Sequence, residues 1–462
     1  MSNILGGVLG DSFGVPTQEL NDLAKALGTG TANTSTYVQG GAPFRVQSLE
    51  GILKVVTYQD RNIVFWKDIP KLQAFNTVEE YNQLTSYGST GSGFFSEGGL
   101  PTEDDSTYVR QTALVKFMGT TGVVTHPLTL VRSAHGDVIG REAKNRTLWL
   151  LQRVEEALFG GNSAINPFAF DGLEKQVVTA NAASQLQENV IDLRGAALDE
   201  ETSENLSRVV ADNFGTLTTL YAGNKVLTDL SKQILPNGRF SLPYGDKEGR
   251  LGYRVRFFDS QVGSYELKPN VFLKAGGPCP TVADAGTSAT GTIVNPLLVG
   301  GIAKSAITQT SQFTAGATYS YRISSIGAAG ETVPSGQLAQ AVAGSTECVQ
   351  LVITNVTGAT GYKVYRAPAG TTTGHLLMTT IPATVGATTT FVDANADLPG
   401  TSKAYGVMID PDQGLAFKQL APLMKMDLAT VAASYRFMVL LYGVPIVYSP
   451  LKQVVIKNIG NL

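Results

Sequence analysis

A break in composition divides this chain more sharply than any motif does. Between residues 276 and 403 charged side chains fall to about half their frequency in the whole chain, and Thr, Ala, Gly and Ser dominate. Pieces rich in β-branched and aromatic residues recur between Gly, Pro and Thr turns, at 319–325, 348–353, 358–366 and 390–393. This pattern is typical of short antiparallel strands and predicts a small β-sandwich inserted into a host chain.

The composition of the whole chain limits the classes of function. Its 462 residues can form two to four domains, and its 50 Gly and 20 Pro favour a loop-rich architecture over a helical bundle. The formal net charge of -3 lacks the basic excess of a dedicated nucleic-acid binder. Cys279 and Cys348 are too few for a disulfide framework, which is compatible with a reducing cytoplasm.

Targeting and membrane signals are missing from the sequence. The N-terminus has no basic segment followed by a long apolar run, so we expect no signal peptide. The longest apolar run, 437–442, is far below the roughly 20 residues that a spanning helix needs. We therefore expect a soluble protein.

The host sequence around the insertion predicts a mixed α and β fold. Residues 1–48 read as a polar arm, followed by strands at 52–58 and 63–66 and a long glycine-rich loop at 72–118. An apolar stripe at helical spacing predicts one long helix over 138–159. Shorter helices are expected at 204–214 and 224–235, and buried strands at 435–442 and 454–456.

Catalytic and metal-binding motifs are absent from the sequence. It contains no P-loop, no His-Glu-x-x-His, no Cys-x-x-Cys and no Gly-x-Ser-x-Gly elbow. The segment His135-Gly-Asp137 reads as a turn before the long helix rather than a metal or base site. We accordingly predict no enzyme activity, no catalytic residues, no cofactor and no metal.

Charged residues in the long loop are the candidate functional residues. Acidic residues there lack the alternating ligand positions of a Ca²⁺ loop, so we interpret them as a solvated face or as partners for basic residues of a neighbouring subunit. The predicted inter-subunit contacts are Glu97, Glu103, Asp104, Asp105, Arg110 and Lys116. Exposed ion pairs of this kind contribute little individually but help to fix register.

The order of these pieces resembles the major capsid proteins of tailed bacteriophages, which have the Hong Kong 97-type fold. The likeness is carried by Thr77–Asn82 and Ser96–Pro101 in the extended-loop position, by the Leu158–Asn162 end of the long helix and by Phe170–Leu173. It covers the host chain outside the insertion. The insertion itself is similar to immunoglobulin-like or fibronectin type III-like modules, although it lacks the Cys-Trp-Cys core of antibody domains.

This resemblance implies an α+β capsid fold with an all-β insertion and a division of the chain into seven parts. They are an N-terminal arm at 1–48, peripheral-domain strands at 49–70, an extended loop at 71–118, a peripheral domain with the spine helix at 119–200, an axial domain at 201–275, the inserted immunoglobulin-like domain at 276–403, and a return to the axial and peripheral domains at 404–462. Gly-rich and Ala-rich linkers would attach the inserted domain, which we expect to project outward.

The resemblance also implies a function and partners. The chain would self-assemble through hexamers and pentamers into an icosahedral shell in the virion, put together in the bacterial cytoplasm and enclosing double-stranded DNA without sequence-specific binding. A separate scaffolding protein and a portal are the implied partners, with room for a decoration protein and no role for a membrane. Some relatives cross-link a loop Lys to a neighbour, but nothing marks Lys71 or Lys116 as reactive, and no cross-link is assigned.

Two alternatives remain open at the level of sequence. An encapsulin-like shell would share the fold and enclose cargo enzymes. A phage tail or adhesin protein would use the β-sandwich as its working part, although such a protein should show repeated sandwiches and the sequence contains a single one.

Overall fold

The computed structural model describes residues 55–88, 93–100, 103–131, 136–183, 188–237, 255–280, 298–304, 311–327, 330–343, 347–429 and 432–460. The predicted arm at 1–48 and His135 lie outside these ranges. The chain divides into two compact units, one of Met1–Val56 with Thr129–Val138 and one of Thr57–Leu128 with Ile139–Leu462. The second unit contains the sheets and cores below.

The helices confirm the main helical predictions. The longest is α6 (Val138–Gly160), and α8 (Glu200–Asp212) and α9 (Asn224–Asn237) follow. α8 begins four residues earlier than predicted because the Asp199 side chain caps it by accepting a hydrogen bond from the Thr202 N–H at 2.8 Å. The other helical segments are η1 (Asp60–Asn62), α4 (Phe65–Asp68), α5 (His126–Leu130), α7 (Leu173–Ala183) and η2 (Pro450–Lys452).

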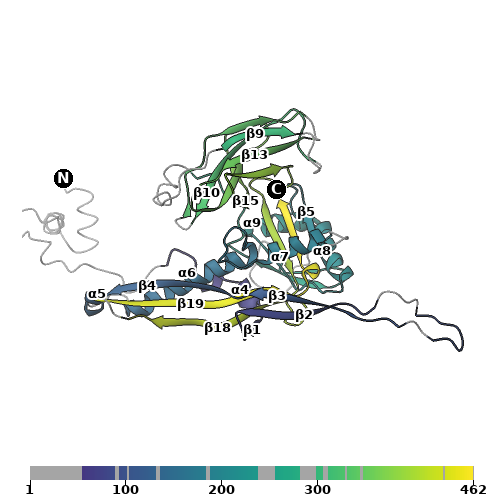
Figure 1. The fold of residues 1–462 in the computed structure, drawn as a ribbon, viewed down its shortest axis with the longest axis horizontal. Coiled ribbons are helices and arrows are strands. Elements are labelled where there is room, and N and C mark those ends of the chain that lie inside the picture. Colours follow the sequence, from purple (N-terminus) through teal and green to yellow (C-terminus); the bar gives the residue numbers. More distant parts are fainter. Residues whose placement is uncertain are drawn as a thin grey trace, which may run out of the picture. The chain divides into compact units, whose positions relative to one another are not determined.

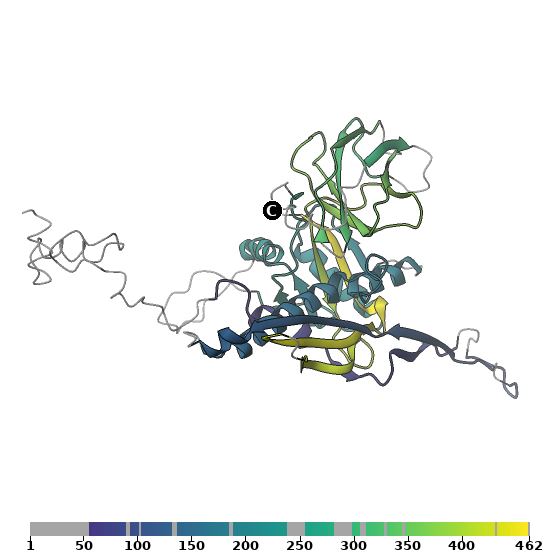
Figure 2. The same cartoon turned by 60° about the vertical axis from the view of Figure 1, so that its left-hand side comes forward.

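One sheet carries the long C-terminal strands. Its order is β1 (Lys71–Gln73), β18 (Leu415–Asp427), β19 (Ser434–Val447) and β4 (Lys116–Thr125), with only the β1–β18 pair parallel. Figures 1 and 2 show α6 along one face of this sheet. Leu150, Val154 and Leu158 of α6 share a core with Phe437 and Val439 of β19, so the apolar stripe of the helix covers this sheet.

A second, mixed sheet has its own core. Its order is β5 (Val190–Asp192), β20 (Val454–Ile459), β17 (Ser402–Val407), β6 (Thr219–Ala222), β8 (Ser264–Pro269) and β7 (Phe257–Asp259). Leu206 and Val210 of α8 and Leu230 of α9 pack with Leu220 and Ile456 of the strands. The predicted C-terminal strands are thus confirmed as parts of two different sheets.

The β-rich segment between β8 and β17 forms two further sheets. One contains β11 (Gly330–Glu331), β10 (Thr318–Gly327), β14 (Ala359–Arg366) and β15 (Leu376–Pro382), with β12 (Leu338–Ala341) paired to β10. The other contains β16 (Thr388–Asp393), β13 (Cys348–Thr354) and β9 (Leu298–Lys304). We call this segment the β module. The strands predicted here are confirmed.

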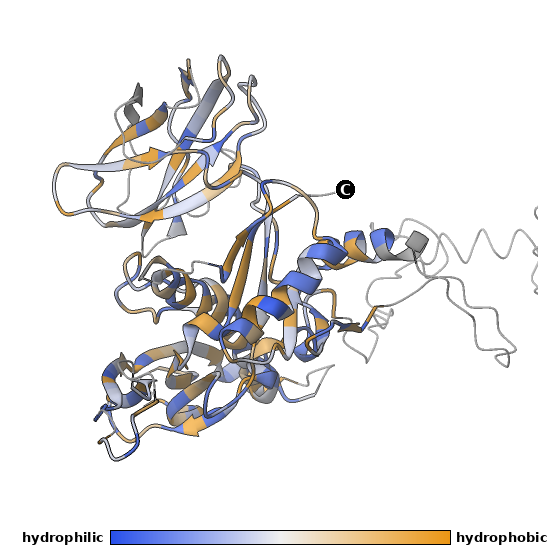
Figure 3. Ribbon diagram, turned by 90° about the vertical axis from the view of Figure 1, so that its right-hand side faces the viewer, coloured by the Kyte–Doolittle hydropathy of each residue, from blue (hydrophilic) through white to orange (hydrophobic). Residues whose placement is uncertain are grey.

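Side chains from both sheets of the β module meet in one core. Tyr321, Ile323 and Val364 come from the first sheet, and Val349 and Leu351 from the second. Figure 3 shows hydrophobic and hydrophilic residues interspersed along these strands, as expected for sheets with one buried face.

The predicted strands near the N-terminal side of the host are wrong where the structure describes them. Val55–Tyr58 are not in a strand, and Phe65–Asp68 form the helical turn α4. The apolar run at 63–66 has the residue types of a buried strand, because Ile63 and Phe65 pack in the core. A tertiary contact with Glu155, described below, fixes the turn. In the described part of the chain, no helix is long and apolar enough to cross a membrane.

Candidate functional site

Many of the large exposed apolar side chains lie on and around a two-stranded ladder. Strands β2 (Val78–Ser86) and β3 (Thr107–Leu114) pair antiparallel, with Asn82 opposite Arg110 and Leu84 opposite Tyr108. Figure 1 shows the two strands side by side. All residues of β3 but one are exposed, and along most of β2 exposed residues alternate with partly buried ones, which leaves aromatic and aliphatic side chains of the ladder in water.

Aromatic residues stand out on this ladder and its connecting segment. Phe94 is 92% exposed, and Tyr87 and Leu100 are each 86% exposed. We define the hairpin surface as the exposed residues Phe75, Tyr87, Phe94, Phe95, Leu100 and Tyr108. Single exposed apolar residues are ordinary, but several large ones along one stretch of chain point to an interaction site.

The ladder is anchored to the rest of the molecule through the middle of β2. The Tyr81 ring packs edge-on against Tyr448 with ring centroids 5.3 Å apart, and Gln83 Nε2 donates to the Tyr448 carbonyl. Burial raises the pKa of the Tyr81 hydroxyl above its usual value, as expected for a phenol removed from water. The anchored part of β2 therefore fixes where the exposed part begins.

The structure separates the predicted contact residues into two groups. The acidic residues Glu97, Glu103, Asp104 and Asp105 are all exposed, and Asp104 lies against Gly88, where an added Cβ would approach its Oδ2 at 2.6 Å. The basic residues are engaged within the chain. Arg110 Nη1 lies 3.3 Å from Glu80 Oε2 on the neighbouring strand, and Lys116 Nζ donates to the Pro167 carbonyl at 2.7 Å.

Sequence reasoning placed the candidates on the loop's charges and missed its aromatic residues. Phe94 and Phe95 stand next to each other in a segment otherwise rich in Gly and Ser. That pairing was the available signal, because two adjacent phenylalanines in a long loop cannot both be buried by the loop itself.

A buried carboxylate of α6, Glu155, binds the backbone at the start of α4. It is completely buried, and its Oε1 accepts from the N–H groups of Val64 at 3.1 Å and Phe65 at 2.8 Å. Its Oε2 accepts from the Trp66 N–H at 2.8 Å, and Asn270 Nδ2 donates to Oε1 at 2.7 Å. One side chain therefore satisfies the free N–H groups at the start of α4.

A charged residue of an amphipathic helix is expected on its polar side, but Glu155 lies on the buried side of α6. It stands four residues after Leu151 and three before Leu158, which is the spacing of the apolar stripe. Burial raises the pKa of the Glu155 carboxyl above its ordinary value, against its hydrogen bonds, which lower it. A charge in the middle of an apolar stripe was the signal that could have located this contact.

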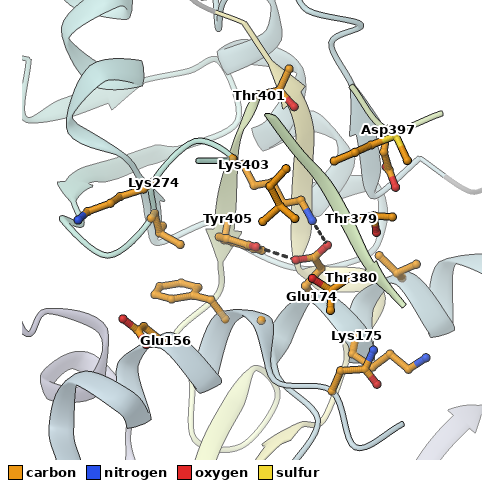
Figure 4. A pocket seen from close by; sticks show the side chains of 18 of the residues that line it. Glu156, Glu174, Lys175, Lys274, Thr379, Thr380, Asp397, Thr401, Lys403 and Tyr405 are labelled. Carbon is orange, nitrogen blue, oxygen red and sulfur yellow. Dashed lines mark hydrogen bonds and ion pairs between the residues drawn. The ribbon is translucent and has the colours of Figure 1, made fainter. Parts of the chain in front are cut away.

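A cavity of about 410 Å³ lies where the β module meets the host chain. Figure 4 shows Thr379 and Thr380 of β15 on one side and Glu174 of α7 with Lys403 and Tyr405 of β17 on the other. The Glu174 carboxylate pairs with Lys403 and accepts from the Tyr405 hydroxyl at 2.9 Å. The cavity's central charges thus neutralise one another.

Within the described residues no cluster of three or more His, Cys, Asp or Glu side chains is suited to hold a metal ion. The described histidines also lie apart: His126 is in α5, and His375 is buried in the β module, with Nε2 2.9 Å from Ser320 Oγ. The features that the geometry does assemble are an exposed apolar surface, a buried structural carboxylate and a polar joint.

Comparison with known proteins gives relatives that span nearly the whole chain. A major capsid protein of Staphylococcus phage K is 26% identical over 471 residues, covering 95% of each chain. A major capsid protein of Staphylococcus phage S25-3 matches equally, and a protein of Enterococcus phage phiEF24C is 25% identical over 481 residues, covering 96% of each chain. No protein-family model matches the chain.

Solved structures give weaker likenesses. The capsid of an empty GTA particle aligns with a TM-score of 0.49 at 11% identity, covering 92% of this chain and 99% of that one. The SrpI encapsulin of Synechococcus elongatus aligns with a TM-score of 0.43 at 10% identity, covering 91% and 94%. All of these scores are below 0.5, so the assignment rests on the sequence relatives.

The sequence relatives, which span nearly the whole chain, indicate a structural protein of a bacteriophage particle. More particularly, the chain is a major capsid protein, and its place is the capsid of the virion. The relatives favour this function over the encapsulin and tail-protein alternatives.

Proposed function

We propose that this major capsid protein self-assembles through hexamers and pentamers into an icosahedral shell of the Hong Kong 97 type, which encloses double-stranded phage DNA. Its elements support the proposal: the host chain contains an exposed two-stranded ladder, one 23-residue helix that follows it, and two mixed sheets. Closed shells need such elements because each subunit must contact several copies of itself through rotational, non-identical contacts.

The seven parts expected from the sequence are the proposed domain organisation of this chain. Residues 71–118, which include β2 and β3, would form the extended loop, and α6 would be the spine helix within 119–200. Residues 201–275 would form the axial domain, and 404–462 would return to the axial and peripheral domains. Residues 1–48 would be the N-terminal arm, and 49–70 would belong to the peripheral domain. A scaffolding protein and a portal remain proposed partners, with room for a decoration protein.

The β module is proposed to be the immunoglobulin-like insertion, at 276–403. Its two sheets enclose a single apolar core that contains Tyr321 and Leu351, as an aligned β-sandwich requires. We propose that it faces outward, away from the DNA. Among its described residues, Lys363 pairs with Glu331 inside the module.

The hairpin surface is the observation that carries the assembly proposal. Phe94 and Phe95 are 92% and 59% exposed, and fully burying a phenylalanine side chain stabilises by roughly 1.5–3 kcal/mol. A monomer that left these rings in water would forgo that stabilisation, whereas a second copy that covered them would gain it at every contact in the shell. Copies repeated around a closed shell multiply the effect.

Removing the two rings tests the proposal. The double variant Phe94→Ser/Phe95→Ser should lose shell assembly in sedimentation while its far-UV circular dichroism stays that of the wild type, because neither ring packs in a core. Val385→Ser is the matched control, since Val385 is fully exposed in the β module and outside the ladder. Normal shells from the double variant would remove the hairpin surface from the assembly mechanism.

A further inference from the structure

The chain passes between the host and the β module twice, and the two crossings are hydrogen-bonded to each other. The Gly276 N–H of the incoming segment donates to the Thr401 carbonyl of the outgoing segment at 3.3 Å. Leu377 at the start of β15 joins both: its N–H donates to the Gly277 carbonyl at 2.9 Å, and its carbonyl accepts from the Gly400 N–H at 3.2 Å. The two crossings are therefore joined to each other and to the module by backbone hydrogen bonds.

Close packing leaves no room for side chains at these crossings. A Cβ added to Gly276 would lie 2.3 Å from the Leu377 carbonyl oxygen, and one added to Gly400 would lie 2.5 Å from Leu376 Cδ1. The glycines of the predicted Gly-rich linkers thus allow the backbone segments to approach closely.

Asn458 of β20 binds the outgoing segment from the host side. Its Nδ2 donates to the Ala396 carbonyl at 2.7 Å, and its Oδ1 accepts from the Leu398 N–H at 2.8 Å. The same Nδ2 donates to Asp192 Oδ1 at 2.7 Å, which ties the side chain to β5. Asn458 is 3% exposed and has a φ of +57°, a left-handed conformation that asparagine tolerates better than most residues.

Arg194 continues the connection into the module's interior. Its Nη1 donates to the Asn395 carbonyl at 2.8 Å, and Asn395 Oδ1 accepts from Arg366 Nη2 at 2.6 Å. Arg366 is 2% exposed and forms an ion pair with the equally buried Asp393. A continuous set of hydrogen bonds therefore links the host strands to the core of the module.

A separate contact supports the module on another side. Gly361 of β14 lies against Ile165 of the host, where an added Cβ would come within 2.9 Å of Ile165 Cγ2. Near this contact, the paired Glu174 and Lys403 line the cavity between the two parts. The module thus touches the host through the crossings, through Asn458 and Arg194, and at Ile165.

We propose that Asn458 and Arg194 are positioning residues that fix the orientation of the β module on the host, so that the module is a rigid projection rather than a tethered one. In a shell, each copy would then present the same module surface at the same angle. That arrangement suits a partner that binds the modules of two neighbouring subunits at once. The two module surfaces would already be oriented, so binding would cost no conformational entropy for ordering them. The rigid joint itself does not require the shell.

Hydrogen exchange of the full-length chain tests the joint at amides that neither residue touches. The variant Asn458→Gly/Arg194→Met removes both side chains while keeping the left-handed φ accessible at position 458. The loss of several hydrogen bonds should speed exchange at the Gly276, Leu377 and Gly400 amides by about tenfold or more. Arg208→Met is the control, because it removes an exposed arginine that pairs with Asp212 and Glu188 elsewhere in the host.

Protection of the Leu351 amide in the module and the Leu220 amide in the host shows whether the variant remains folded. Unchanged exchange at Gly276, Leu377 and Gly400 in the double variant would overturn the proposal, as would unprotected exchange at these amides in the wild type. If the double variant loses protection at Leu351 and Leu220 as well, the single variant Arg194→Met is measured instead. Exchange at the Gly276, Leu377 and Gly400 amides then tests the proposal in the same way. A failure of the chain to form shells would refute the proposed function but leave this measurement intact.

Discussion

Replacing Glu155 should destabilise the host far more than the same change at the next residue. Glu155→Leu removes the acceptor of three backbone N–H groups and of the Asn270 amide. Each donor left buried without a partner costs about 1–3 kcal/mol, partly offset by the apolar side chain that replaces the carboxylate. We expect a net loss of about 4 kcal/mol in the free energy of unfolding.

Glu156→Leu supplies the matched control. Glu156 is partly exposed and pairs with Arg153 at 2.9 Å on the helix surface, an interaction worth roughly 0.5 kcal/mol. Urea unfolding of the dissociated full-length chain, followed by the fluorescence of the buried Trp66, measures both variants. Equal losses from Glu155→Leu and Glu156→Leu would refute the claim that Glu155 organises the start of α4.

The charge of Glu155 adds a pH dependence with a definite sign. Because burial raises its pKa in the folded state above the ordinary value of 4.5, the folded chain retains a proton that the unfolded chain has released. The free energy of unfolding of the wild type should therefore fall, relative to Glu155→Gln, as the pH rises from 4.5 through the folded pKa. A constant difference between the two across this range would contradict the pKa shift.

Three further changes have defined outcomes. Burial lowers the pKa of His375 below 6.5, so the stability of the β module should fall as the pH drops below 6.5. Hydrogen exchange in β13 measures this stability, and the same pH dependence in His375→Gln would contradict the prediction. Arg366→Met leaves Asp393 buried and uncompensated and should cost the module about 3–5 kcal/mol in calorimetry, with an equal shift of the host transition counting against it. Gly161→Ala should destabilise by about 1–3 kcal/mol because its Cβ would lie 2.6 Å from two carbonyl oxygens; Gly160→Ala, with open space around it, should not, and equal unfolding midpoints would refute the difference.

Local periodicity predicted the elements that it controls. The α6 stripe, the short helices α8 and α9 and the β-module strands all appear, because their apolar spacing matches the period of the element they form. The apolar run at 63–66 failed this test. Its residues are buried whichever element they adopt, and the choice of a helical turn depends on Glu155, which lies about 90 residues away in sequence.

The candidate contact residues stay a prediction. The long loop was chosen for its acidic residues, and the structure also exposes the aromatic residues Phe94, Phe95 and Tyr108 on the same segment. The joint of the β module was harder to foresee. Its glycines indicate Gly-rich linkers in the sequence, and only the tertiary contacts of Asn458 show that they permit close backbone packing.

The central claim is that this major capsid protein builds a closed shell from copies of itself. Negative-stain electron microscopy of the purified full-length chain tests it most directly, alongside the Phe94→Ser/Phe95→Ser variant. We predict icosahedral shells for the wild type and dissociated subunits for the double variant. Fibres or discrete small oligomers from the wild-type chain would contradict the claim.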